Sequence, residues 1–132
     1  MTSLAALPHF LAYLGVSILV LAVFLVIYTW MTRHNEWDLI RRGNTAASVS
    51  LSGALIGFSL PLASVIAHAG DFADLVVWAL VAMVVQLIAY FLVNVIASDV
   101  SAAIERGQMA QAVMLGTGGV VMGILNAACL TY

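Results

Sequence analysis

Residues 75–98 read LVVWALVAMVVQLIAYFLVNVIAS and contain no charged side chain. A helix of about 20 residues is long enough to cross the hydrocarbon core of a bilayer. Three further uncharged stretches exceed this length, at residues 1–32, 43–70 and 107–132. Each stretch is long enough for one crossing and too short for two. The sequence therefore predicts four transmembrane helices, near Phe10–Met31, Thr45–His68, Leu75–Ala97 and Met109–Leu130.

The composition excludes most other classes of protein. Of 132 residues, 64% are apolar, and the charged residues are four arginines and six acids. A soluble domain is about half apolar and roughly a quarter charged, and a chain this short leaves about a third of its unfolded surface exposed. A soluble domain is therefore excluded, and so is a nucleic-acid binder, which needs a basic face. We expect one integral membrane domain over residues 1–132, folded as an all-α four-helix bundle.

The arginines predict the orientation of this bundle. Three of the four lie between the first and second predicted spans, and Arg106 lies between the third and fourth. The intervening loop contains no arginine and carries Asp71 and Asp74. Cytoplasmic loops of membrane proteins are enriched in Lys and Arg. The first and third loops are therefore predicted to be cytoplasmic, with both termini in the periplasm.

A shift of 64 residues aligns two parts of the chain. Arg42-Gly43-Asn44 then faces Arg106-Gly107-Gln108, and several Ala, Val and Leu positions coincide. We interpret this as two tandem repeats, one over about residues 10–68 and one over about 75–130. Because each repeat holds two spans, the copies would share their orientation across the membrane. In each of these Arg-Gly segments, the glycine is expected to adopt the left-handed conformation that ends a helix. In the first segment, Asn44 or Thr45 would cap the next helix.

Several short motifs carry a resemblance to a known family. They are Asn35-Glu36-Trp37, Asn44-Thr45-Ala46-Ala47-Ser48, Ser52-Gly53, Gly57, Pro61-Leu62 and the closing Asn126-Ala127-Ala128-Cys129. With them the chain resembles the YjfL-like small bacterial inner-membrane proteins, the family of domain of unknown function 350. The resemblance implies four spans and an inner-membrane location, and it implies no reaction and no catalytic residue. Some members are encoded beside phage-shock-type membrane-remodelling proteins, which implies a context of envelope maintenance.

Small residues form a stripe on one face of two predicted spans. The second span has Ser50, Gly53 and Gly57 at helical spacing, and the fourth has Gly116, Gly119 and Gly123. Such faces let helix backbones approach closely within a bilayer. One interpretation is packing of the two spans inside one chain. The other places one stripe in a homo-oligomer, most simply a dimer, since a four-helix bundle would satisfy only one stripe internally.

A second stripe is polar and uncharged. Gln86, Tyr90 and Asn94 follow one another at steps of four in the third span, and Asn126 lies in the fourth. These residues are expected either to link helices by hydrogen bonds or to line a pathway for a solute or a lipid headgroup. Gln86 is expected to bond with Asn126 or with a serine of the second span. The Ser50 and Ser59 region is preferred, because Asn126 lies close to the outer end of its span.

The remaining polar residues lie outside the predicted spans or near their ends. In loop 33–42 the charges are expected to face water, with pairing of Asp38 with Arg42 and of Glu36 with Arg41. This loop and loop 99–108 either extend the adjacent helices or bind a cytosolic membrane-remodelling partner. His9, His68 and Cys129 show no metal-ligand spacing, so no metal, cofactor or catalytic residue is predicted.

Two functions follow from these observations. The first is a non-enzymatic membrane anchor or assembly factor in envelope maintenance, because the spans carry no charge and the loops are short. The second is a small oligomeric channel or transporter for a neutral or weakly polar solute, because the chain has a repeat and a polar stripe. Transport would need a lumen between subunits, since a four-helix bundle of this size has a filled core.

The predicted orientation is open to a direct test. A reporter that is active only in the periplasm, fused after Tyr132, is expected to be active, because positive-inside charge places this terminus outside. A reporter that is active only in the cytoplasm is expected to be silent at the same position. The reverse pair of results would invert the topology.

Overall fold

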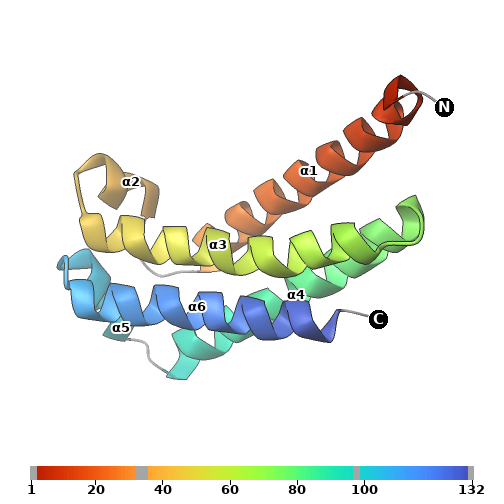
Figure 1. Cartoon of the computed structure of the whole chain (residues 1–132). Helices are drawn as coiled ribbons and strands as arrows, with labels where there is room; N and C mark the ends of the chain where they lie inside the picture. The colour runs from red at the N-terminus through yellow and green to blue at the C-terminus, as the bar shows by residue number, and fades with distance from the viewer. Residues whose placement is uncertain (1–2, 32–35, 97–98, 131–132) are drawn as a thin grey trace.

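The protein is a bundle of four long helices with two short helices at one end (Figure 1). The structure, a computed structural model, describes residues 3–31, 36–96 and 99–130. The four helices long and apolar enough to span a membrane are α1 (Leu7–Met31), α3 (Thr45–His68), α4 (Phe72–Ile96) and α6 (Met109–Cys129). A 3-10 helix η1 (Ser3–Ala6) precedes α1, and the short helices are α2 (Glu36–Arg41) and α5 (Asp99–Glu105). Over these ranges no residue is in a strand, and the predicted all-α membrane fold is confirmed.

Helices α3 and α6 run parallel and side by side through the bundle (Figure 1). Their glycines bring the two backbones together: a Cβ atom on Gly57 would lie 2.5 Å from the Gly119 carbonyl oxygen. A Cβ on Gly53 would overlap the backbone of Gly116, and one on Gly123 would overlap the backbone of Gly57. Only glycine fits at these positions, so the contact is made by backbone atoms. We call this contact the glycine seam.

Both small-residue stripes lie in the glycine seam. Ser50, which belongs to the α3 stripe, is as deeply buried as the glycines, and the Ser64 hydroxyl donates to the Ala127 carbonyl across the seam at 3.1 Å. Packing within one chain is thus the interpretation that the structure supports. The premise that one stripe would remain for a partner is wrong, because the stripes face each other. The homo-oligomer stays a prediction without this support.

Helices α1 and α4 cover one side of the seam with an aromatic core. Phe24 of α1 stacks on Phe58 of α3 with ring centroids 4.5 Å apart. Tyr28 of α1 meets Tyr90 of α4 edge to face at 5.0 Å. All four rings are buried. Aromatic pairs of this geometry add about 0.5–1.5 kcal/mol to the burial of their surface, and they fix how α1 and α4 cross.

The two short helices end in the same turn. Gly43 after α2 has φ +82°, and Gly107 after α5 has φ +77°. In each turn the N–H of the glycine and of the next residue bond back to carbonyls three and five residues earlier, as in a Schellman motif. The predicted left-handed glycines are confirmed. The turns are 64 residues apart, at the spacing of the predicted repeat, and the repeat itself stays a prediction.

Asn44 ties the two halves of this end together. Its Oδ1 accepts a hydrogen bond from the Ala47 N–H at 3.1 Å and so caps α3, as predicted. Its Nδ2 donates to the carbonyl of Ile104 in α5 at 2.8 Å. Below it, an apolar cluster holds α2 and α5 against the starts of α3 and α6, and it consists of Leu39, Ala46, Ala47, Ile104 and Ala112. The counterpart residue, Gln108, makes no such cap for α6.

The glycine seam gives a prediction for stability. Gly53→Ala is expected to lower the free energy of unfolding by about 1–3 kcal/mol, because its methyl group would overlap Gly116. Gly15→Ala is the matched control, since a Cβ there meets nothing within 4 Å. Thermal unfolding of both variants in detergent micelles measures the difference. Equal melting temperatures for the two variants would contradict a seam built on backbone contact.

Candidate functional site

A group of polar side chains lies in the centre of the bundle, between α4 and α6. We define the central polar cluster as Gln86 and Tyr90 of α4 with Asn126 of α6. Gln86 is fully buried, and Tyr90 and Asn126 are 4% and 6% exposed. Three of the four residues of the predicted polar stripe are therefore brought together. The fourth, Asn94, lies on α4, and its side chain is outside the part of the chain that the structure describes.

Hydrogen bonds in this cluster join α4 to α6. The Gln86 side chain donates through Nε2 to the carbonyl of Gly119 at 3.0 Å. Asn126 Nδ2 donates to the carbonyl of Ala82 at 3.2 Å and lies 3.5 Å from Gln86 Oε1. Tyr90 places its hydroxyl against Gly119, where a Cβ atom would overlap it. The cluster is neutral and cross-links two helices by amide-to-carbonyl bonds.

The preferred prediction, a hydrogen bond from Gln86 to a serine in the Ser50 and Ser59 region, is wrong. Ser50 donates instead to the Ala47 carbonyl of its own helix at 3.0 Å, and the exposed Ser59 donates to Ile56 at 2.8 Å. Asn126, the other expected partner, is the one in contact. Its position close to the end of α6 argues against this contact, but α6 is offset along α4 so that Asn126 meets Ala82 and Gln86. The position of Asn126 within α6 therefore does not predict its depth relative to Gln86 in α4.

The prediction that the Glu36 side chain faces water is wrong. Glu36 lies at the start of α2 and is 1% exposed. Its carboxylate is close enough to interact electrostatically with Tyr28 and Tyr90. In the sequence, the one signal that sets Glu36 apart from the other charged residues of this loop is its place in the Asn35-Glu36-Trp37 motif. The expected pairing of Asp38 with Arg42 is confirmed, since Arg42 donates to Asp38 at 2.6 Å and both side chains are largely exposed.

Polar residues also lie at the end of the bundle opposite α2 and α5. His68 bonds the carbonyl of Ser64, the rings of His9 and Tyr13 meet at a tilt with centroids 4.1 Å apart, and Cys129 is a free, exposed thiol. Asp71 accepts from the N–H of Asp74 at 2.8 Å and so caps α4. Among the described residues, no three His, Cys, Asp or Glu side chains are grouped to hold a metal ion. Arg33 and Asn35 of the first loop lie outside those residues.

The contact between Gln86 and Asn126 can be measured by a double-mutant cycle. Gln86→Leu is expected to change the free energy of unfolding little, because leucine is tolerated in this environment and one interhelical bond contributes about 0.6 kcal/mol. Unfolding of Gln86→Leu, Asn126→Leu and the double variant gives the coupling energy, which we expect to be about 0.6 kcal/mol and below about 1.7. Strict additivity of the two single changes would show that the pair does not interact.

Comparisons with known proteins identify the family. The family described as Domain of Unknown Function (DUF350) matches residues 1–130. The UPF0719 inner membrane protein YjfL of Escherichia coli K12 is 37% identical over 129 residues, covering 98% of each chain. The UPF0719 transmembrane protein YshE of Bacillus subtilis is 27% identical over 81 residues, covering 61% of this chain and 60% of that protein. No solved structure matches. With its four apolar helices and a match over nearly its whole length, the chain belongs to the DUF350 family.

Proposed function

We propose that this protein is a non-enzymatic anchor or assembly factor of the bacterial inner membrane, with a role in envelope maintenance. Two findings support the location: the four apolar helices, and the name of the E. coli relative as an inner membrane protein. The envelope role rests on the family resemblance. The partner would be a cytosolic membrane-remodelling protein, bound at the end of the bundle that carries α2 and α5.

The observation that carries this proposal is the packing of the two short helices against the starts of α3 and α6. We call α2 and α5 together the platform. Leu39 of α2 and Ile104 of α5 are buried in one apolar cluster, and Asn44 bonds across to α5. A short helix held in this way keeps its outer face in a fixed position. In contrast, α3 and α4 are joined at the opposite end by only a tight turn, closed by the bond from the Gly70 N–H to Asp74 at 3.0 Å.

The outer face of this platform has the chemistry of a protein-binding surface. Trp37 is 46% exposed. Arg41 and Arg42 follow it closely in the sequence and are exposed, and Arg106 is exposed in the turn after α5. Tryptophan and arginine are the residues most enriched among those that dominate binding energy at protein interfaces. A membrane protein that positions them on a fixed surface can hold a cytosolic partner against the bilayer.

A transporter or channel is the second candidate, and one observation favours it. The hydroxyl of Tyr28 is buried without a hydrogen-bond partner among the described residues, and the buried Glu36 is close enough to Tyr28 and Tyr90 to interact electrostatically with both. Polar groups left open at depth are typical of pathways through membranes. The aromatic core fills the single bundle, so the predicted homo-oligomer belongs with this candidate.

Site-specific photocrosslinking in living cells tests the anchor. A photoreactive amino acid at Trp37 is expected to capture a discrete protein partner, because this side chain projects from the platform. The same group at His68 is the control, since that residue is also exposed and lies at the opposite end of the bundle. Identical adducts at both positions, or none at Trp37, would contradict a partner bound at α2 and α5.

Leakage from liposomes separates the two candidates. Vesicles that contain the purified protein are expected to release a trapped neutral solute such as glycerol no faster than vesicles without it, because aromatic rings fill the bundle centre. Faster release that is abolished by Gln86→Leu, with the melting temperature unchanged, would replace the anchor with the transporter.

A further inference from the structure

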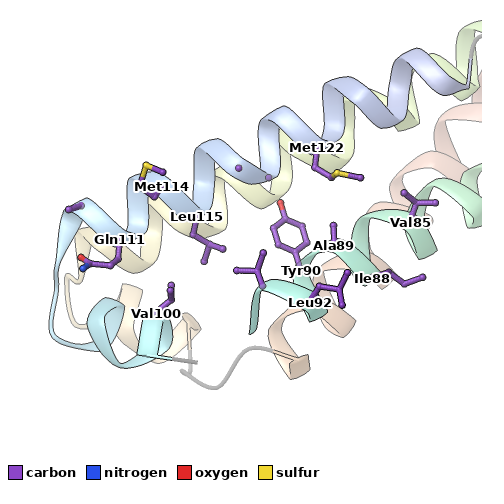
Figure 2. A pocket seen from close by; sticks show the side chains of 14 residues that line it. Val85, Ile88, Ala89, Tyr90, Leu92, Val100, Gln111, Met114, Leu115 and Met122 are labelled. Carbon is purple, nitrogen blue, oxygen red and sulfur yellow. The ribbon is translucent and has the colours of Figure 1, made fainter. Parts of the chain in front are cut away.

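An apolar groove of about 750 Å³ opens between α4 and α6 at the end closed by α5 (Figure 2). Its walls are aliphatic and methionine side chains, with the Tyr90 ring between the two helices (Figure 2). Only Tyr90 and Gln111 among the lining residues carry a polar side-chain group, and Gln111 lies at the α5 end. Met114 and Met122 form part of the wall, and methionine adapts its shape to irregular apolar ligands.

The length of the groove matches one leaflet of a membrane. Its lining on α6 runs from Ala110 to Met122, which is about 18 Å along a helix. This is a little over half of the roughly 30 Å hydrocarbon core. Near the end of the groove away from α5, the bond from Gln86 to the lining residue Gly119 joins α4 to α6. A transmembrane helix of a second copy would need the whole thickness, whereas a single acyl chain occupies one leaflet.

The corresponding place in the first half of the chain is filled. Phe24 and Phe58 stack there, and both rings are fully buried. At a shift of 64 residues their counterparts are Ile88 and Met122, which line the open groove. Ile88 is 53% exposed. The second half therefore lacks the two rings that fill this place in the first half, and space for a ligand remains.

The α5 end of the groove is suited to an anionic headgroup. Arg106 is exposed in the turn that joins α5 to α6, the two helices that form this end. The Gln108 side chain does not cap α6, so the N–H groups of the first turn of α6 receive no hydrogen bond from the residue at the N-cap. Such a helix start attracts negative charge, and an arginine beside it adds to the attraction. An acyl chain in the groove would bring a lipid phosphate to this point.

We propose that the groove between α4, α5 and α6 binds one acyl chain of a glycerophospholipid from the leaflet on the α5 side, with the lipid phosphate at Arg106 and the first turn of α6. This lipid site lies in the groove and shares Arg106 with the partner surface described above. It makes a bound phospholipid a component of the folded protein and distinguishes it from the lipids that surround every membrane protein.

Gly118→Leu is the variant that tests the site. Gly118 lines the groove, and a Cβ atom there meets nothing within 4 Å, so leucine fills the space of the acyl chain without a clash. Gly15→Leu is the matched control, because Gly15 also has open space around it and lies on α1, outside the groove. Native mass spectrometry from detergent, with added dioleoylphosphatidylglycerol, measures the affinity of the first retained lipid.

The wild type and Gly15→Leu are expected to retain one phosphatidylglycerol, and Gly118→Leu is expected to bind it about tenfold more weakly at an unchanged melting temperature. Dioleoylglycerol, which lacks the phosphate, separates the acyl chain from the headgroup. Arg106→Gln is expected to weaken phosphatidylglycerol about two- to fivefold and to leave dioleoylglycerol unchanged.

Three results would overturn the proposal. One is equal retention of phosphatidylglycerol by Gly118→Leu and Gly15→Leu. Another is a wild type that retains none. The third is a wild-type dimer that Gly118→Leu converts to a monomer, which would make a second copy the occupant. If Gly118→Leu does not fold, Ala89→Phe, which narrows the groove from α4, replaces it with the same expected loss.

Discussion

The approach of two helix backbones across the glycine seam determines how the rest of the bundle is built. Lipid tails are as apolar as leucine, so association of helices in a bilayer depends on close packing and on hydrogen bonds. Glycines meet without ordering any side chain, and a Cβ on Gly53, Gly57 or Gly123 would strike backbone atoms. Helices α1 and α4 then cover one side of this pair, and α2 and α5 are held at its end.

The seam also creates the environment of the central polar cluster. Gly119 has no side chain, so its carbonyl is open to Gln86 from α4 while Tyr90 packs onto its Cα. In an apolar medium an amide without a partner is costly, and this carbonyl supplies the partner. The same residue therefore belongs to the packing of α3 with α6 and to the bond that attaches α4. A larger side chain at Gly119 would disturb both contacts.

Much of this arrangement could be predicted from the sequence, because its causes are local. The positions of the charges gave four helices within a few residues of their ends, and Gly43 and Asn44 gave the turn and cap. The partner of Gln86 and the burial of Glu36 could not be predicted. The first depends on the offset between α4 and α6, and the second on the folding of α2 towards the tyrosines of α1 and α4. Both are tertiary features without a periodic signal. The groove is a space left between helices, which single-residue patterns do not reveal.

The glycine seam has a consequence for how the protein is made. Its two helices come from opposite halves of the chain, with α4 and α5 translated between them. Chains enter the membrane from the N-terminus onward, so α3 is already in the bilayer while α6 is still being synthesised. During that interval the glycine face of α3 lacks its partner helix. Helix α6 therefore completes the central contact of the molecule. If translation stops before α6 is made, the released chain cannot form the glycine seam.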